Sequence, residues 1–131
     1  MTERTGRYVW VRRALGLAAM GCWAGVAALF GIAVVEGGSM EPALHHGDLA
    51  VYRRGSTAIE RGDIVLFDKP GWPGGVLHRV CDVGGDGSVL TRGDANPVRD
   101  RDPVASEDVR GVVVLVVPSG EPLGTLADHV W

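Results

Sequence analysis

Cysteine is scarce in this sequence, and the two cysteines present, Cys22 and Cys81, form no Cys-x-x-Cys pair. The four histidines include no His-Glu-x-x-His pair, so the ligand spacings typical of zinc sites are missing. We therefore expect no metal site, and no stretch of the sequence calls for a cofactor.

A cluster of Lys and Arg that could neutralise nucleic-acid phosphates is also missing. The formal net charge is -3, and residues 36–131 carry nine basic and fifteen acidic side chains. A mildly acidic chain of this kind lacks the electrostatic footprint of a nucleic-acid-binding protein. We therefore expect no nucleic-acid partner.

Long hydrophobic runs are limited to one, residues 14–35, which contain no charged side chain. As a helix, about 22 residues extend about 33 Å, enough for a bilayer core of about 30 Å. Four arginines precede this run, so the positive-inside rule places residues 1–13 in the cytoplasm and residues 36–131 outside. We therefore predict a single-pass transmembrane helix, contact with membrane lipid and localisation to the cell membrane. A cleaved signal peptide and a buried core helix remain alternatives.

The remaining domain, residues 36–131, contains no second long helical pattern. Gly-Asp pairs at 47–48 and 62–63 each precede a short apolar stretch, as expected where a turn starts a strand. The predicted strands are 49–52, 64–67, 76–83, 88–92 and 109–117. This pattern predicts a mainly β fold class, with a small curled antiparallel sheet or barrel preceded by one N-terminal transmembrane helix.

Two further segments are predicted to lie outside these strands. Residues 69–75 are rich in Pro and Gly, and proline cannot donate a hydrogen bond to a β ladder, so a loop is expected there. Residues 123–129, near the C-terminus, indicate a short turn of helix.

Ser39 follows the hydrophobic run closely and is the first candidate for catalysis. A serine hydroxyl becomes an effective nucleophile when a neutral base accepts its proton. His78 lies within a predicted strand, where alternation places it on the same face as Val76 and Val80. Spacing alone leaves two interpretations open for His78, a catalytic base and a structural histidine that is hydrogen-bonded within the fold.

A third group is needed to orient the imidazole and to stabilise its charged form. Two carboxylates follow the predicted strand at 88–92, namely Asp94 and Asp100. Asp94 stands in a Gly-Asp-Ala-Asn stretch typical of turns, where aspartate binds local backbone groups. Asp100 is flanked by Arg99 and Arg101, with which it could form a solvated ion pair. The residues alone do not decide which carboxylate meets the histidine.

The stretch Gly38-Ser39-Met40-Glu41-Pro42 resembles the nucleophile box of type I signal peptidases. Later stretches resemble the following boxes of that family in the same order: Gly47-Asp48, Gly62-Asp63-Ile64-Val65, Leu77-His78-Arg79-Val80 and Thr91-Arg92-Gly93-Asp94-Ala95-Asn96. The resemblance covers roughly residues 10–118 and is closest to the branch with a histidine base, the eukaryotic secretory and archaeal type. A histidine is mostly neutral at pH 7, whereas a lysine base must first be desolvated.

By position, the resemblance implies Ser39 as the nucleophile, His78 as the general base and Asp100 as the aspartate that completes the site. Supporting positions are Asp94, Met40 and Pro42, which would brace the site, line the substrate cleft and fix the turn after the nucleophile. The implied function is that of a membrane-anchored serine endopeptidase, signal peptidase I, which removes N-terminal signal peptides from exported preproteins. By the same resemblance, its substrates have small residues at the first and third positions before the cut.

One position departs from the family pattern. Many members have a hydroxyl residue two positions before the nucleophile that helps to form the oxyanion hole, and here this position is Gly37. Loss of one oxyanion donor can cost about 10² to 10³ in rate. Two alternative functions therefore stay open, a dedicated maturation protease for one or a few proteins and a catalytically silent β domain that binds a partner. The oligomeric state is also left open.

Overall fold

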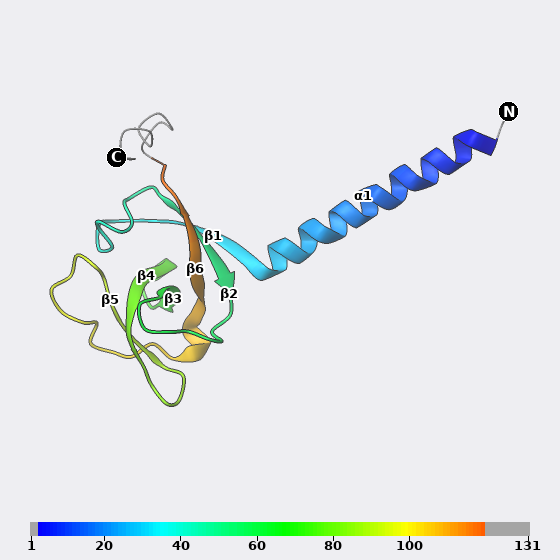
Figure 1. Ribbon diagram of the computed structural model, residues 1–131. Helices are drawn as coiled ribbons and strands as arrows, with labels where there is room; N and C mark the ends of the chain where they lie inside the picture. Colours follow the sequence, from blue (N-terminus) through cyan, green and yellow to red (C-terminus); the bar gives the residue numbers. More distant parts are fainter. Residues whose placement is uncertain (1–2, 120–131) are drawn as a thin grey trace, which may run out of the picture. The chain divides into compact units, whose positions relative to one another are not determined.

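The computed structural model describes residues 3–119, which form one long helix and a six-stranded sheet (Figure 1). The elements are α1 (Glu3–Leu29), β1 (Phe30–Val34), β2 (Leu49–Arg54), β3 (Ile64–Lys69), β4 (Trp72–Val83), β5 (Val89–Arg92), the 3-10 helix η1 (Ser106–Asp108) and β6 (Val109–Val117). The chain divides after Phe30 into two compact units, and each is described by itself. The predicted helical turn at 123–129 lies outside the described residues.

The helix α1 ends at Leu29, and the next five residues form the strand β1. The prediction of one helix over residues 14–35 is therefore wrong in its last part. Among the residues described, no helix combines the length and the apolar character needed to cross a bilayer, so the predicted transmembrane helix is not supported either. The physical reason for the early end is strand pairing, because β1 is the neighbour of β2 in the sheet.

Close packing at Gly31 shows how tightly β1 joins the β body. A Cβ atom at this position would come within 2.3 Å of Tyr52 Cζ on β2. Beyond the end of β1, the N–H of Val35 donates to the carbonyl of Asp48 at 2.8 Å, and the carbonyl of Val35 accepts from Gly47 N–H at 2.8 Å. A short apolar segment can form either a helix or a strand, and tertiary contacts such as these decide which of the two forms.

The two Gly-Asp turns form as predicted. Gly47 and Gly62 have φ of 92° and 96°, values in the left-handed region that favours glycine. The following carboxylates accept backbone N–H groups within the same turn, since Asp48 binds His45 N–H at 2.9 Å and Asp63 binds Glu60 N–H at 2.9 Å. The strands β2 and β3 begin directly after these turns.

The strand β4 begins earlier than expected and replaces most of the predicted loop at 69–75. Lys69 pairs with Trp72, so that only residues 70 and 71 remain as the turn of the β3–β4 hairpin. The register shifts between Phe67 and Lys69, and this irregularity accommodates Pro73 without requiring a hydrogen bond from its nitrogen. The loop prediction failed because it treated every proline as a break in pairing.

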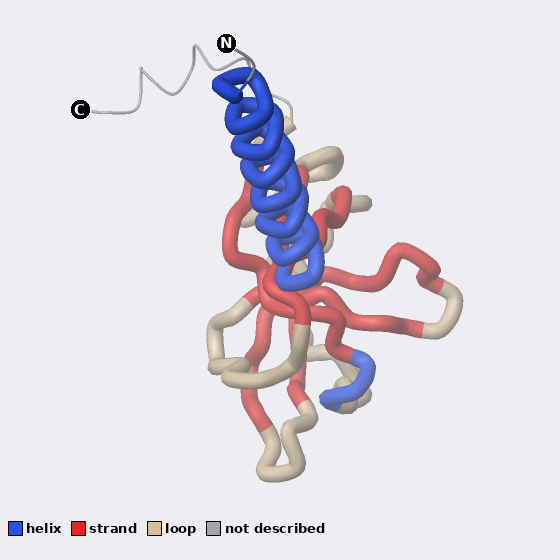
Figure 2. Tube along the Cα trace, turned by 90° about the vertical axis from the view of Figure 1, so that its right-hand side faces the viewer, coloured by secondary structure: helices blue, strands red, loops and turns tan. Residues whose placement is uncertain are grey.

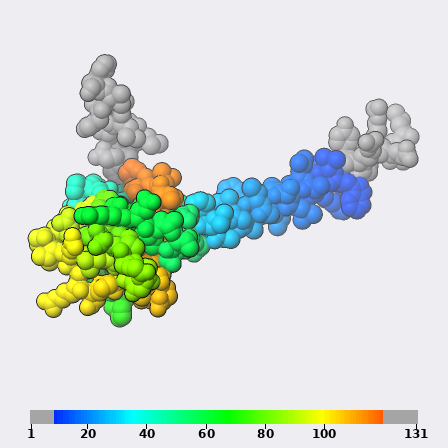
Figure 3. Space-filling model, turned by 60° about the horizontal axis from the view of Figure 1, so that its bottom comes forward, coloured from blue at the N-terminus to red at the C-terminus, as the bar shows by residue number. Residues whose placement is uncertain are grey.

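The six strands form an open sheet in the order β1-β2-β6-β3-β4-β5, and the pairs from β2 to β5 are antiparallel. The mainly β prediction is confirmed, with β1 and β5 as the outermost strands of the sheet. Val89 of β5 forms a further antiparallel bridge to Val104. Figure 2 shows the strands of the body joined by loops at their ends, and Figure 3 shows that their side chains close into a continuous surface on the face drawn.

The strand β3 contributes to the core on both faces of the sheet. Its alternating side chains divide between two core clusters, with Leu66 in one and Val65 and Phe67 in the other. The first cluster contains Val35, Met40, Leu44, Ala50, Tyr52, Leu66 and Leu77. The second contains Val65, Phe67, Val80, Val89, Val104, Val109 and Val112. The first cluster lies under the turn that carries Ser39, since Met40 and Leu44 belong to it.

Gly111 provides a test of this packing, because β6 joins β2 to β3. A Cβ atom at Gly111 would lie 2.1 Å from the Arg53 carbonyl oxygen, a backbone atom that cannot rotate away. We expect Gly111→Ala to lower the free energy of unfolding by about 1–3 kcal/mol, as other overpacking changes do. Gly85→Ala is the matched control, because a Cβ atom there meets no atom within 4 Å. Equal denaturation midpoints for the two variants would contradict the proposed register.

Candidate active site

A cleft of about 870 Å³ brings together the three residues implied as catalytic, Ser39, His78 and Asp100. They reach it from three parts of the chain: the turn after β1, the strand β4 and the loop after β5. Part of the cleft wall is apolar and is formed by Met40, Tyr52, Leu66 and Leu77 from the first core cluster, whereas charged side chains line other parts. The cleft can therefore enclose an extended apolar segment next to a small polar group.

His78 and Asp100 form the shortest contact in this group, with 2.6 Å between His78 Nδ1 and Asp100 Oδ2. The same carboxylate oxygen accepts the hydroxyl of Thr91 at 2.7 Å, and Asp100 N–H donates to the Thr91 carbonyl at 2.8 Å. The His78 side chain is only 8% exposed, so its orientation is fixed. A proton on Nδ1 directed at the carboxylate leaves Nε2 as the acceptor nitrogen of the neutral ring.

The pairing of β4 explains why the histidine is held there. His78 pairs with Val65 on β3, and its ring meets Phe67 edge-on with 6.1 Å between centroids. On the other side, Val80 pairs with Thr91 on β5, so alternation places His78 and Thr91 on the same face. The sheet thus places the His78 imidazole and the Thr91 hydroxyl next to the same carboxylate, that of Asp100.

Ser39 is half-buried in the turn that precedes β2, and the loop after β5 fastens this turn. The Ser39 carbonyl accepts the N–H of Ala95 at 2.9 Å. The two backbones are so close that a Cβ atom at Gly93 would lie 2.6 Å from the Ser39 carbonyl oxygen. Ser39 and His78 line the same cleft, although within the described residues no hydrogen bond joins their side chains. Catalytic hydrogen bonds are often long before substrate binds.

Gly37, which replaces a hydroxyl residue of the family pattern, takes part in a different contact. Its N–H donates to Nδ1 of His46 at 3.0 Å, and its φ is 76°. This bond holds the turn before Ser39. It also means that the Gly37 N–H is already occupied and is not a free donor toward the cleft.

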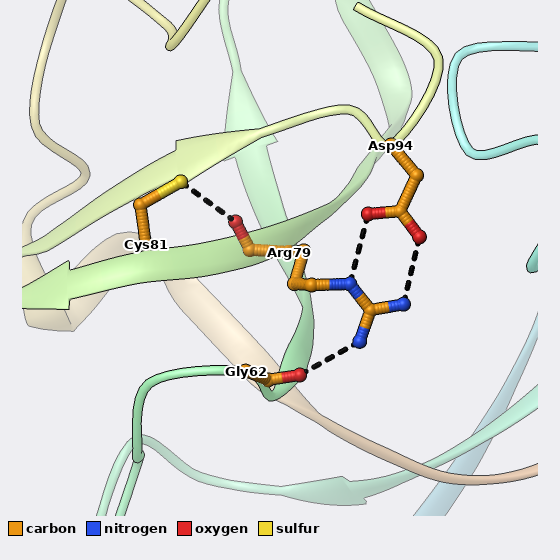
Figure 4. Close-up of polar contacts among 4 residues, drawn as sticks. All are labelled: Gly62, Arg79, Cys81 and Asp94. Atoms are coloured by element: carbon orange, nitrogen blue, oxygen red, sulfur yellow. Dashed lines mark hydrogen bonds and ion pairs between the residues drawn. The ribbon is translucent and has the colours of Figure 1, made fainter.

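Asp94 binds Arg79 rather than the histidine. Arg79 Nε donates to Asp94 Oδ1 at 2.8 Å and Nη2 donates to Oδ2 at 2.7 Å, while Nη1 donates to the carbonyl of Gly62 at 2.8 Å (Figure 4). The hydrogen bonds from Arg79 lower the pKa of Asp94, and the bonds from Asp94 raise the pKa of Arg79. Asp94 therefore connects the loop after β5 to β4. Of the two candidate carboxylates, Asp100 is the one beside the imidazole.

The two remaining predicted site residues differ in their surroundings. Met40 is buried and lines the cleft. Pro42 is exposed, follows a cis Glu41–Pro42 peptide bond and does not line the cleft. Thr91 is a site residue that is not predicted from the sequence. It reaches the site through the pairing of Val80 with Thr91, a β4–β5 register that the sequence does not reveal.

A metal ion would need several side chains that can bind it together. Within residues 3–119, no group of three or more His, Cys, Asp or Glu side chains is placed to hold an ion. The cleft thus offers a hydroxyl, an imidazole and a carboxylate, the combination used for acyl transfer by a serine nucleophile.

Comparison with known proteins supports the same chemistry. The family model described as "Signal peptidase, peptidase S26" matches residues 7–95. The chain is similar to the signal peptidase complex catalytic subunit SEC11C of Homo sapiens, with 42% identity over 88 residues that cover 60% of this chain and 46% of that protein. It is also similar to the SEC11 subunit of Chaetomium globosum, with 34% identity over 113 residues that cover 76% of this chain and 66% of the relative. The chain spans about half the length of the mammalian relatives it matches.

These findings confirm the predicted family and its branch, since the relatives are eukaryotic catalytic subunits. Ser39, His78 and Asp94 lie within the region matched by the family model, whereas Asp100 lies five positions beyond its end at residue 95. The position of Asp100 in the site therefore rests on the geometry of its contacts with His78 and Thr91.

The Arg79–Asp94 pair predicts a pH-dependent contribution to stability. Because the pKa of Asp94 is lowered in the folded protein, the contribution is complete above the ordinary carboxyl pKa and is lost as pH falls below about 4. At pH 7 we expect Asp94→Asn to destabilise the fold by about 1–2 kcal/mol, a value that allows for solvent screening of the partly exposed Arg79. Urea unfolding between pH 3 and 7 measures this difference.

Asp102→Asn is the matched control, because it removes the same charge from an exposed position of the following loop. Its unfolding free energy should follow the wild type at every pH. A constant difference between Asp94→Asn and wild type down to pH 3 would show that ionisation of Asp94 is not the cause.

Proposed function

The chain belongs to the signal peptidase family, peptidase S26, and on this basis we propose that it is a serine endopeptidase that cleaves signal peptides from preproteins. The observation that carries the proposal is the 2.6 Å bond between His78 and Asp100 in a cleft that Ser39 also lines. The relatives are named as catalytic subunits of signal peptidase complexes, and these names supply the substrate class.

In this proposal the hydroxyl of Ser39 attacks the carbonyl carbon of the scissile peptide bond. His78 Nε2 accepts the hydroxyl proton as the new C–O bond forms, and the Ser39 N–H donates to the oxyanion that develops. Collapse of the tetrahedral intermediate breaks the C–N bond, and the proton passes from His78 to the leaving amine. Water, activated by the same imidazole, then hydrolyses the acyl-enzyme.

Asp100 has the role of holding His78 in one tautomer and of stabilising the imidazolium that forms. Thr91 supports this role, because its hydroxyl bond to Asp100 satisfies the oxygen that faces the ring. Asp94 acts one step further away. Through Arg79 it holds the loop whose Ala95 N–H binds the Ser39 carbonyl, so it positions the nucleophile rather than touching the reacting atoms.

The cleft supports a substrate in an extended conformation. Its lining includes residues 32–35 from the β1 end of the sheet and Trp72 at the start of β4. The apolar wall formed by Met40, Leu66 and Leu77 suits small apolar side chains next to the cut. The preference for small residues at the first and third positions is proposed from the family alone.

A second candidate is a dedicated maturation protease for one or a few proteins. The missing hydroxyl at Gly37 favours it, because the Gly37 N–H is occupied by His46 and one oxyanion donor of the family pattern is absent. A panel of synthetic preproteins discriminates the two. A general signal peptidase cleaves most of the panel at comparable kcat/KM, whereas a dedicated enzyme cleaves one class at least about tenfold better.

Location at the cell membrane stays a prediction from the sequence. Its support is the uncharged segment at 14–35 and the arginines before it, not the extent of α1. We expect the expressed full chain to sediment with membranes and to resist extraction by alkaline carbonate while dissolving in detergent. Recovery in the carbonate supernatant would contradict an integral association.

The catalytic roles lead to a direct test with purified full chain in detergent. We expect Ser39→Ala and His78→Ala each to lower kcat/KM for a synthetic preprotein by about 10³-fold or more, because neither can be replaced within the triad. Asp100→Asn should lower kcat more than it raises KM, since it disturbs the tautomer of His78 rather than substrate binding.

Matched controls are Ser56→Ala and His45→Ala, which remove the same groups at positions that do not line the cleft. Circular dichroism should show the wild-type fold for every variant. Full activity of Ser39→Ala or His78→Ala would end the proposal, and a wild-type chain inactive on every preprotein would favour a silent binding domain.

A further inference from the structure

A second pocket, of about 420 Å³, is lined by four arginines from separate parts of the chain. Its lining residues are Arg61, Gly62, Arg79, Val80, Cys81, Arg92, Pro97 and Arg99. None of these residues lines the cleft that contains Ser39 and His78. The pocket is therefore separate from the candidate active site, and the proposed reaction leaves it without a role.

The concentration of positive charge is unusual for this domain. Residues 36–131 carry nine basic side chains against fifteen acidic ones, and four of the nine line this one pocket. Arg79 is neutralised by Asp94. Among the described residues, no carboxylate lies within ion-pair distance of Arg61, Arg92 or Arg99. Arg92 is close enough to Asp94 to contribute to the lowered pKa of that carboxyl, although it forms no ion pair with it. Positive charge therefore exceeds negative charge around this volume.

Acidic neighbours in the sequence are engaged elsewhere. Asp63 accepts the N–H of Glu60 in its own turn, and Asp100 binds His78 and Thr91. These carboxylates lie within two positions of pocket arginines along the chain, yet their hydrogen bonds are made to other partners.

Strand register places two of the arginines directly opposite each other. Arg79 on β4 pairs with Arg92 on β5, and like charges at such positions destabilise a sheet. Alternation puts both on the face opposite to His78 and Thr91. Arg79 is held in place by its bonds to Asp94 and to the Gly62 carbonyl (Figure 4). One wall of the pocket is therefore rigid before any ligand binds.

We propose that this pocket binds a phosphate-bearing anion. The planar guanidinium forks of Arg61, Arg92 and Arg99 match phosphate oxygens and bind them through paired, charge-assisted hydrogen bonds. The volume accommodates a phosphate group with part of the molecule attached to it. A soluble phosphate ester and an anionic phospholipid headgroup share this chemistry.

A bound phosphate would connect β4, β5 and the loop that contains Asp100, because Arg92 and Arg99 come from the last two. Binding only to the folded protein raises its stability. The expected signature is therefore an increase in melting temperature that depends on phosphate and is independent of peptidase activity.

The test uses the full chain in detergent, with inorganic phosphate as the probe and sodium chloride at equal ionic strength as the reference. We expect phosphate to raise the melting temperature and to give a saturable binding isotherm. The double variant Arg92→Gln/Arg99→Gln should bind phosphate at least about tenfold more weakly, a loss of about 1.4 kcal/mol. Arg101→Gln, which removes one positive charge two positions from Arg99 and outside the pocket, should bind like wild type.

A vesicle arm separates the two sources of phosphate. Wild type and both variants are compared on phosphatidylcholine vesicles with and without phosphatidylglycerol. Greater binding to the anionic vesicles that is lost in the double variant alone assigns the pocket to a lipid headgroup, and saturable binding of free phosphate alone assigns it to a soluble ester. The proposal is overturned if neither probe exceeds its reference, or if the double variant and Arg101→Gln lose binding equally. Because activity is not measured, this result is independent of the proposed peptidase function.

Discussion

The hydrogen bond between His78 and Asp100 is the contact on which the candidate site depends, and much of the fold serves to make it. The two residues are 22 positions apart, and Ser39 precedes His78 by a further 39 positions. Such a bond forms only if β4 pairs with β3 on one side and with β5 on the other. A buried imidazole without this partner would leave a polar group unsatisfied, so the sheet, the loop after β5 and the site stabilise one another.

The loop at 93–100 joins these parts through contacts with three different elements. Arg79 on β4 binds Asp94, the turn before β2 binds Ala95 through the Ser39 carbonyl, and Thr91 on β5 binds both the N–H and the carboxylate of Asp100. The loop has no regular secondary structure, yet its polar groups have defined partners. Ser39 and His78, the candidate nucleophile and base, are therefore both bonded to the same short segment, which limits how far one can move relative to the other.

The sequence predicted best where local chemistry decides the structure. The turns at Gly47-Asp48 and Gly62-Asp63 follow from glycine's access to positive φ, and the strands after them follow from alternation. Prediction failed at Phe30–Val34, because an apolar run suits a helix and a strand equally until it packs against Tyr52. The residues alone left Asp94 and Asp100 open, and only the family resemblance favoured Asp100, since the choice depends on Arg79 reaching the loop from the other face of β4. The part played by Thr91 depends likewise on the register of β4 with β5.

Adjacent residues of β4 point to opposite sides of the sheet, with His78 lining the candidate active-site cleft and Arg79 lining the arginine-lined pocket. The number of residues between the hairpin turn and His78 is therefore constrained, because it decides which side chain faces which side of the sheet. One residue inserted between the hairpin turn and His78 would exchange the two side chains and destroy both environments at once. Two inserted residues would keep both side chains on their own faces, and a single one would do so only if a bulge absorbed it, like the register shift around Cys81 later in the same strand.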